Sequence, residues 1–361
     1  MNVGIPKESR PSENRVGLPP SGVRSLSNRG HTCYIEHEAG LISGFTDRDY
    51  EDAGGKIVYS AHEAFGRADL VLKFSRPLEE ELDMVQDGAA VCGFLHLSSA
   101  SQSKFDRILE KNITTIAYEQ VQEEDSSRPI LRTMSEIGGR LSAQIAANLL
   151  QNNQGGKGIL LGGTPGVPPA EVVIIGGGVF GQFATRAFNG MGAHVTVLDM
   201  SHNALRDIQN QFPLTVTMFA SQENIARTCA YADVVIAAAA TPGHPAPKLI
   251  TRAILKGMKE RAILMDVSID QGGNAETSRP TTHDTPTYIE EGVIHYCVPN
   301  LSSVIARTAT NAFFNAAKPY ILELANKGPE KAIKENPAIA KAVNTHKGEI
   351  LNLTRMTPKG N

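Results

Sequence analysis

Three glycines after an apolar run have the spacing of a phosphate-binding turn. The run from Val172 to Ile175 is followed by Gly176, Gly178 and Gly181, which gives the pattern GxGxxG. The first glycine permits a tight turn, the second lets the backbone approach a pyrophosphate, and the third allows close helix–strand packing. The free N–H groups of the following helix attract an anion. The segment therefore predicts a dinucleotide site, with a ligand-free glycine turn as the alternative.

An acidic residue follows at the distance that a nicotinamide dinucleotide site requires. Asp199 ends the next apolar run and lies 18 residues after Gly181. Its carboxylate can accept a hydrogen bond from a ribose 2′-hydroxyl and would repel a 2′-phosphate. No arginine follows it directly. The pattern therefore favours NAD over NADP as the cofactor.

A histidine, an aspartate and an arginine could carry acid–base and carboxylate chemistry. His96 lies near the end of the apolar run 89–97, and Asp270 ends the run 263–270 before a Gly-Gly pair. Both positions are at the carboxyl ends of predicted strands, where open α/β sheets bind ligands. Arg15 lies in the loop after the first strand and could hold a carboxylate through two N–H groups.

Each of these three residues also has a purely structural interpretation. A histidine in an apolar strand is often a satisfied core residue, as His96 would then be. An aspartate can cap a turn, which would explain Asp270. A single loop arginine such as Arg15 is usually solvated. The sequence pattern alone leaves these alternatives open.

The elements that must position these residues alternate between strands and helices. The first series has predicted strands at 3–6, 32–36, 70–74, 90–97 and 114–119, with helices such as 21–29 and 104–111. The second has strands at 172–175, 194–198, 234–238, 263–267 and 294–298. Longer helices are predicted at 135–150 and 309–325. This alternation predicts an α/β protein with two Rossmann-like, doubly wound parallel-sheet domains and an interdomain cleft.

Length, charge and cysteine usage narrow the class of protein. A chain of 361 residues is long enough for two domains. The net charge of −3, without a long run of either sign, argues against nucleic acid or an anionic membrane as a partner. No apolar stretch approaches the ~20 residues of a membrane helix, and no signal peptide is visible. Four scattered cysteines without a CxxC pair predict no metal site and fit a reducing cytoplasm.

The chain resembles alanine dehydrogenase and the related nucleotide-binding subunit of proton-pumping transhydrogenase. The matching stretches include Phe94-Leu-His96-Leu, Met134-Ser-Glu-Ile-Gly-Gly-Arg140 and Asp266-Val-Ser-Ile-Asp-Gln-Gly-Gly273. Others are residues 4–8, 13–16, 68–73, 162–167, 279–283 and 295–298. Together these stretches extend over nearly the whole chain. The presence of His96 and the Asp-Gln-Gly-Gly stretch makes the chain more similar to the dehydrogenases than to the transhydrogenase subunit.

The resemblance implies an NAD-dependent amino-acid dehydrogenase that catalyses the reversible oxidative deamination of a small L-amino acid to its 2-oxo acid. It also implies a substrate domain at residues 1–128 plus 307–361, and an NAD-binding Rossmann domain at 129–306. A homo-oligomer, either a hexamer or a dimer, is implied as well.

The resemblance further assigns roles to individual residues. Arg15 corresponds to the substrate carboxylate anchor, His96 to the acid/base, and Asp270 to its catalytic partner. The substrate side would also include Lys73 and Ser75. The cofactor side would consist of the glycine motif with its neighbours and four further positions: Gly176, Gly178, Val179, Phe180, Gly181, Asp199, Ser135, Ser221, Asn300 and Leu301.

One departure from the family pattern concerns the substrate side. Alanine dehydrogenases have Lys-Val-Lys-Glu-Pro where this chain has Lys73-Phe-Ser75-Arg-Pro77, and the second lysine contacts the substrate. Its replacement by Ser75 removes a charge-assisted contact with the substrate and enlarges the substrate pocket. One alternative is therefore a larger amino-acid or imine substrate. Another is a non-catalytic NAD-binding subunit or sensor, against which the presence of Arg15, His96 and Asp270 argues.

Overall fold

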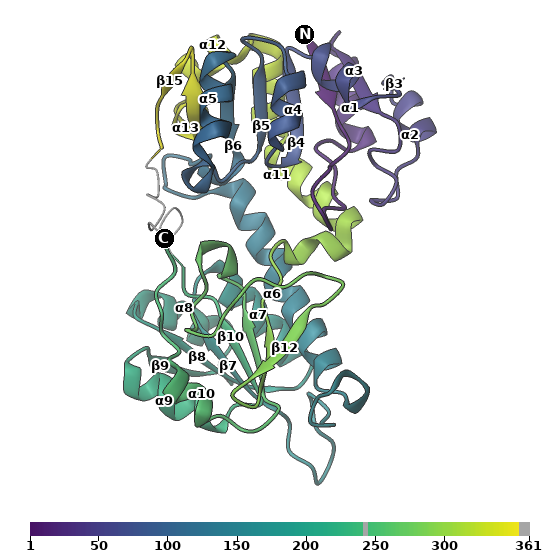
Figure 1. The fold of residues 1–361 in the computed structure, drawn as a ribbon. Coiled ribbons are helices and arrows are strands. Elements are labelled where there is room, and N and C mark those ends of the chain that lie inside the picture. The colour runs from purple at the N-terminus through teal and green to yellow at the C-terminus, as the bar shows by residue number, and fades with distance from the viewer. Residues whose placement is uncertain (241–244, 354–361) are drawn as a thin grey trace. The chain divides into compact units, whose positions relative to one another are not determined.

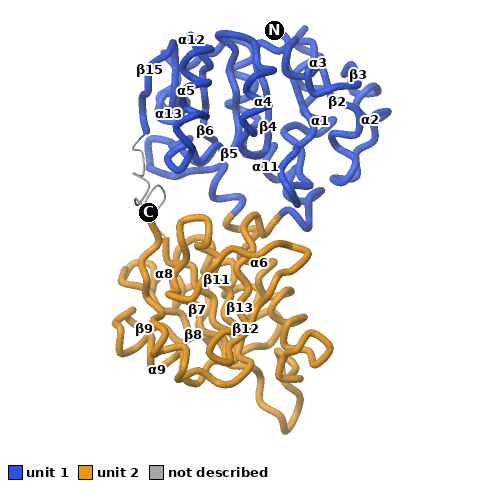
Figure 2. The backbone as a smooth tube through the Cα atoms, viewed as in Figure 1, with its two compact units in different colours: residues 1–134, 303–361 blue, residues 135–302 orange. Residues whose placement is uncertain are grey.

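The computed structural model describes residues 1–240 and 245–353. The chain forms two compact units, shown in different colours in Figure 2. Unit 1 consists of residues 1–134 together with the C-terminal segment from residue 303, and unit 2 consists of residues 135–302. Unit 1 is thus built from two separate stretches of chain, whereas unit 2 is continuous.

Unit 1 has an eight-stranded sheet in the order β15-β14-β6-β5-β4-β1-β2-β3 (Figure 1). Its strands are β1 (Asn2–Ile5), β2 (Thr32–Glu36), β3 (Lys56–Val58), β4 (Leu70–Ser75), β5 (Ala90–Phe94), β6 (Thr114–Ala117), β14 (Val343–His346) and β15 (Glu349–Ile350). Strands β1 to β6 run parallel. Because β4 and β5 are buried along their whole length, both faces of the sheet need helices.

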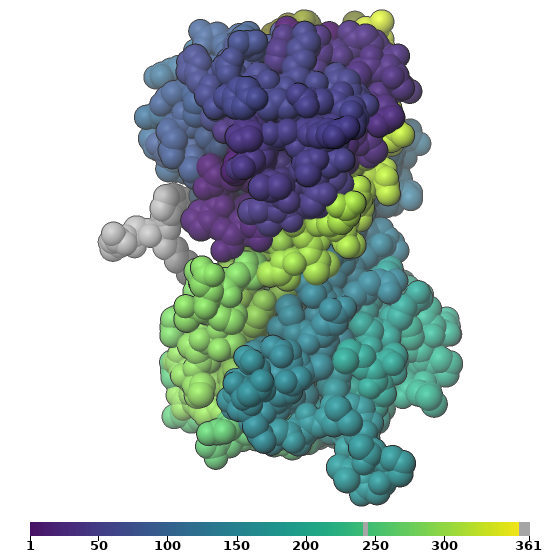
Figure 3. All heavy atoms as spheres, turned by 90° about the vertical axis from the view of Figure 1, so that its right-hand side faces the viewer, coloured from purple at the N-terminus to yellow at the C-terminus, as the bar shows by residue number. Residues whose placement is uncertain are grey.

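These helices come from both stretches of chain. They are α1 (Pro20–Ser27), α2 (Asp47–Glu51), α3 (Ala61–Gly66), α4 (Glu79–Met84), α5 (Gln102–Glu110), α11 (Ala306–Lys327), α12 (Pro329–Glu335) and α13 (Pro337–Ala342). In Figure 3 purple atoms of the N-terminal stretch border yellow-green atoms of the C-terminal stretch. The contact is anchored by Phe313 of α11, which is fully buried, with its ring centre 4.9 Å from that of Phe74 and 5.0 Å from that of Tyr118.

Unit 2 has a seven-stranded sheet in the order β12-β13-β11-β10-β7-β8-β9. The strands are β7 (Glu171–Ile175), β8 (His194–Asp199), β9 (Val216–Phe219), β10 (Val234–Ala237), β11 (Ile263–Asp266), β12 (Thr287–Glu290) and β13 (Val293–Tyr296). The helices are α6 (Pro129–Leu149), which begins in unit 1, α7 (Val179–Gly190), α8 (His202–Gln211), α9 (Gln222–Tyr231) and α10 (Arg252–Lys256). Apolar clusters cover both faces of the sheet. The predicted Rossmann-like α/β class with two domains is confirmed.

The two sheets are parallel except at their edges, where antiparallel strands are added. Strand β12 is antiparallel to β13, and β14 is antiparallel to both β6 and β15. Each of the two hairpins turns through two residues with positive φ: Glu291 and Gly292 in one, Lys347 and Gly348 in the other. Positive φ at both central residues is the condition for a type I′ hairpin turn, which matches the twist of the strands it joins.

Among the described residues, no helix combines the length and apolar character that a membrane span requires. The four cysteines are buried and unbridged. Burial raises the pKa of the Cys33, Cys92 and Cys229 thiols to about 12. These thiols are therefore packing residues rather than nucleophiles.

Candidate functional site

The glycine-rich turn of unit 2 uses each of its three glycines differently. Gly176 has φ +115, and a Cβ placed there would lie 2.6 Å from the carbonyl oxygen of Ala238. A Cβ on Gly181 would clash with the carbonyl oxygen of Gly176. At Gly178 a Cβ would meet no atom within 4 Å. The first and third glycines are thus required by packing, whereas the second exposes backbone beside open space at the start of α7.

Phe180, the second residue after this turn, packs α7 against α6. Val179 and Phe180 are half-buried. A Cβ on Gly139 would lie 2.5 Å from the Phe180 carbonyl oxygen, and one on Gly138 would lie 2.8 Å from its ring. The Gly138-Gly139 pair therefore lets the two helices approach closely. The ring of Phe180 packs against α6, so its backbone is the part of this residue that lies at the turn.

Asp199, the last residue of β8, is tied to the glycine turn. Its Oδ2 accepts a hydrogen bond from the peptide N–H of Gly177 at 2.6 Å, and its Oδ1 accepts one from Ser201 at 2.7 Å. On the neighbouring strand end, the Ser221 hydroxyl accepts from the N–H of Asn224 and caps α9. The structure thus brings together three predicted cofactor elements: the turn, Asp199 and, through β8–β9 pairing, Ser221.

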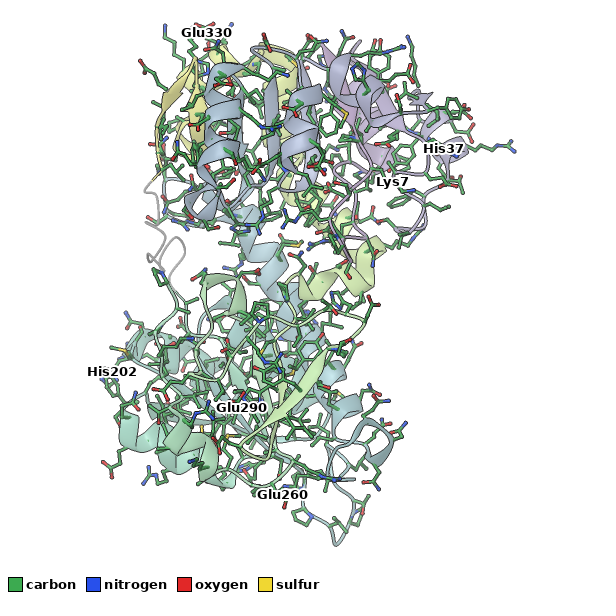
Figure 4. All side chains as sticks on the ribbon, viewed as in Figure 1. Lys7, His37, His202, Glu260, Glu290 and Glu330 are labelled. Atoms are coloured by element: carbon green, nitrogen blue, oxygen red, sulfur yellow. The ribbon has the colours of Figure 1, made fainter. Side chains whose placement is uncertain are left out.

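The edge of this region is formed by the start of α8. His202 opens that helix, as labelled in Figure 4, and its ring centre lies 5.6 Å from that of Phe219. Phe219 ends β9 and is 44% exposed. Both rings are exposed and lie beside the carboxyl ends of β8 and β9.

Asp270 lies on a loop that a buried aspartate holds in place. It is exposed, in the 3-10 turn after β11. Asp266, at the end of β11, accepts from the N–H of Asn274 at 2.6 Å and from the Ser278 hydroxyl at 2.5 Å. The Asn274 amide in turn bonds both the N–H and the carbonyl of Ala239. These bonds couple the loops after β10 and β11. Neither Asp266 nor Asn274 was predicted from the sequence to have this role.

The remaining predicted cofactor residues lie where the chain enters unit 2 and where it leaves this unit. Ser135 is half-buried in α6. Asn300 is exposed and has φ +55, a left-handed conformation that asparagine tolerates. Leu301 begins a 3-10 turn and packs against the core of unit 2 beside Gly138.

In unit 1, Arg15 is buried and rigidly held rather than solvated. Its Nε lies 2.6 Å from Oε1 of Glu13 and its Nη2 lies 2.5 Å from Oε2, so one edge of the guanidinium is bound in a fork. The guanidinium carbon lies 3.8 Å from the ring centre of Phe74. The Arg15 side chain is 5% exposed. This combination of a carboxylate partner and an aromatic face fixes the direction in which the arginine points.

Lys73 and Ser75, on β4, belong to a buried network of carboxylates. The Lys73 ammonium lies 2.7 Å from Glu81 and 3.4 Å from Glu8. The Ser75 hydroxyl donates to Glu8 at 2.8 Å. Burial raises the pKa of Glu8, although Lys73 acts in the opposite direction. Because the Lys73 side chain has no exposed surface, its charge pairs with these carboxylates. The structural roles of Glu8, Glu13 and Glu81 were not predicted from the sequence.

His96 lies two residues beyond the end of β5 and is not a core residue. Its side chain is 49% exposed, and its ring stacks on Phe94 with centres 6.4 Å apart. The predicted strand 90–97 therefore ends early, at Phe94. Strands β1, β4 and β5 are neighbours, and the Phe74 and Phe94 rings, 5.3 Å apart, connect Arg15 to His96. His96 belongs to unit 1 and Asp270 to unit 2, so their pairing stays a prediction.

Two family models match consecutive parts of the chain. The Alanine dehydrogenase/PNT N-terminal domain matches residues 4–138, and the corresponding C-terminal domain matches residues 142–353. An alanine dehydrogenase from Methanococcus maripaludis is 45% identical over 352 residues, covering 97% of this chain and 94% of the relative. One from Mycobacterium tuberculosis is 44% identical over 353 residues, covering 98% and 95%.

Solved structures give a consistent result. An L-alanine dehydrogenase superposes with a TM-score of 0.93 at 40% identity and covers 97% of both chains. A transhydrogenase from Sinorhizobium meliloti superposes with a TM-score of 0.82 at 25% identity, covering 97% of this chain and 99% of the other. The resemblance inferred from the sequence motifs is therefore confirmed.

The glycine assignments can be tested by two matched substitutions. Gly181→Ala should lower the free energy of unfolding of unit 2 by about 1–3 kcal/mol, because the new methyl group would overpack the turn. Gly178→Ala should change it by less than about 0.5 kcal/mol, because the site is open. Urea unfolding followed by circular dichroism measures both. Equal losses in the two variants would contradict the packing role given to Gly181.

Proposed function

The chain belongs to the alanine dehydrogenase/PNT family, and from this membership we propose that it is an NAD-dependent enzyme that oxidatively deaminates L-alanine or another small L-amino acid. It is an oxidoreductase acting on the CH–NH2 group of its substrate. The observation that carries the proposal is the likeness of both domains, over nearly the whole chain, to alanine dehydrogenases.

The described residues fit a nicotinamide dinucleotide. The open space at Gly178 accepts a pyrophosphate close to the backbone, beside the N–H groups that begin α7. The Asp199 carboxylate already accepts two peptide N–H bonds and has lone pairs left for a ribose hydroxyl. When bound, NAD supplies the hydride acceptor, whereas the chain supplies binding and orientation.

Different residues of unit 1 would bind the substrate and transfer its protons. Arg15, held by Glu13 and Phe74, binds the substrate carboxylate. Once the Cα–N bond of the substrate has been oxidised to an iminium, water attacks its carbon, and His96 takes the proton that the water loses. His96 then returns this proton to the nitrogen of the resulting carbinolamine, and ammonia leaves as the hydroxyl gives its proton to His96 and becomes the carbonyl of the 2-oxo acid. We assign to Asp270 the stabilisation of the cationic intermediates, as the family pattern implies.

The proposal is tested by a substrate screen with the full-length protein. The purified chain is mixed with NAD and single L-amino acids, and NADH is followed at its absorbance maximum. The expected result is NADH formation with alanine or another small amino acid, accompanied by release of one ammonia per NADH. Tight NAD binding without turnover of any amino acid would instead favour a non-catalytic NAD-binding subunit.

Cofactor preference depends on Asp199. We expect kcat/KM for NAD to exceed that for NADP, and Asp199→Ala to reduce the difference by at least about tenfold, because the repulsion of a 2′-phosphate disappears. Asp207→Ala, an exposed aspartate on α8, is the matched control and should leave the ratio unchanged. Equal use of NAD and NADP by the unmodified protein would disprove this assignment.

The role of His96 has an equally direct test. His96→Ala should lower kcat by a factor of about 10²–10⁴, the usual contribution of a general acid–base, and leave the Kd for NAD nearly unchanged. His62→Ala removes an exposed histidine of α3 and serves as the control. If both variants turn over at the same rate as the unmodified protein, His96 has no catalytic role.

Ser75 bears on which amino acid is preferred. A lysine here would give the substrate a charge-assisted hydrogen bond of roughly 1.5–3 kcal/mol, which is about one to two decades in kcat/KM. Ser75→Lys should therefore raise kcat/KM for alanine and lower kcat/KM for larger amino acids. Ser75→Ala should not raise kcat/KM for alanine. An unmodified protein that prefers alanine, with no gain from lysine, would show that Ser75 does not select the substrate.

A further inference from the structure

The peptide unit that carries His96 has an unusual backbone conformation. His96 has φ 44 and ψ 43, which lies in the left-handed region that residues with a Cβ rarely adopt. It stands between β5 and a short 3-10 turn, Leu97–Ser99. A conformation of this kind persists only where neighbouring groups hold it, and such residues cluster at functional sites.

A single carboxylate holds the backbone of this turn. Glu119 lies just after β6, the neighbour of β5 in the sheet. Its Oε1 accepts the peptide N–H of His96 at 2.7 Å, and its Oε2 accepts that of Leu95 at 3.2 Å. The Glu119 side chain is only 12% exposed, so water competes weakly for these two bonds. One residue thus secures both N–H groups at the point where the chain leaves the strand.

The same carboxylate also faces the imidazole ring. Nδ1 of His96 lies 3.7 Å from Oε1 of Glu119. This distance is longer than a hydrogen bond but short enough for a strong electrostatic preference. A carboxylate beside one ring nitrogen favours the tautomer that carries the proton on that nitrogen. The other nitrogen, Nε2, is then left with a free lone pair.

We propose that Glu119 is a positioning residue for the acid–base chemistry of His96. It fixes the left-handed turn that carries the ring, and it keeps the proton on Nδ1. Nε2 is therefore the atom that takes the proton of the attacking water and passes it to the departing amine nitrogen. This inference rests on the proposed function, in which His96 is the acid/base.

The tautomer can be observed directly in the unmodified protein. With 15N-labelled histidine, the His96 ring signals are assigned by their disappearance in His96→Asn. The expected spectrum is that of the Nδ1–H tautomer at a pH where the ring is neutral. A predominant Nε2–H tautomer would overturn the inference, whatever the variants do.

The variants then separate positioning from mere structural support. Glu119→Gln keeps the size of the side chain but removes its charge, and its single amide oxygen can accept only one of the two peptide N–H bonds, so the preference for the Nδ1–H tautomer should weaken. We expect kcat to fall about ten- to hundredfold, the loss typical of a group that orients a functional histidine, with KM and the Kd for NAD within about twofold. Glu119→Asp keeps the charge and should recover part of kcat and the Nδ1–H spectrum. Glu124→Gln, an exposed position nearby, is the matched control.

The outcomes distinguish this inference from the proposed function. If His96→Ala lowers kcat but a folded Glu119→Gln does not, the role of Glu119 is wrong and that of His96 stands. If His96→Ala has no effect, the proposed role of His96 fails first. A reduced kcat with an unchanged tautomer in Glu119→Gln also overturns the inference, because Glu119 would then act only through the fold. Should Glu119→Gln unfold, Glu119→Asp and the spectrum of the unmodified protein decide.

Discussion

Parallel strand pairing places the carboxyl ends of neighbouring strands at one edge of each sheet, and both candidate sites depend on this constraint. In unit 1, Ser75 ends β4 and His96 follows β5. In unit 2, Asp199 ends β8 and Asp270 follows β11. Residues far apart in the chain become neighbours because successive parallel strands return to the same edge. The side chains that do chemistry are thus carried by loops, while the buried strands supply a rigid support.

The buried carboxylates at these strand ends orient neighbouring side chains and loops. Arg15 is oriented by Glu13, and the Ser75 segment by Glu8. Asp266 orders the loop of Asp270 through peptide N–H groups. A buried carboxylate that accepts several N–H or ammonium donors gives direction as well as attraction. The cost of burying these charges is offset by their mutual pairing, and the loops remain defined without regular secondary structure.

The glycine turn and Asp199 could be predicted from the sequence because their roles depend on local spacing. The hairpin turns at Glu291-Gly292 and Lys347-Gly348 carry a weaker signal, because glutamate and lysine are not the asparagine or aspartate that usually precedes glycine in a type I′ turn. The buried carboxylates could not be predicted. Glu8 meets Ser75 across 67 positions of chain, and no periodicity marks such a pair. The early end of β5 was missed for the same reason, because a distant side chain sets it.

The two-part construction of unit 1 has a consequence for biosynthesis. The ribosome releases residues 1–134 and then the whole of unit 2 before it delivers α11, yet Phe313 of α11 fills the aromatic core beside Phe74, Phe94 and Tyr118. The continuous unit 2 can close its core while translation continues. The N-terminal stretch of unit 1, residues 1–134, must wait without the apolar face of α11. The nascent chain is therefore most exposed to aggregation and to chaperone capture just before α11 emerges.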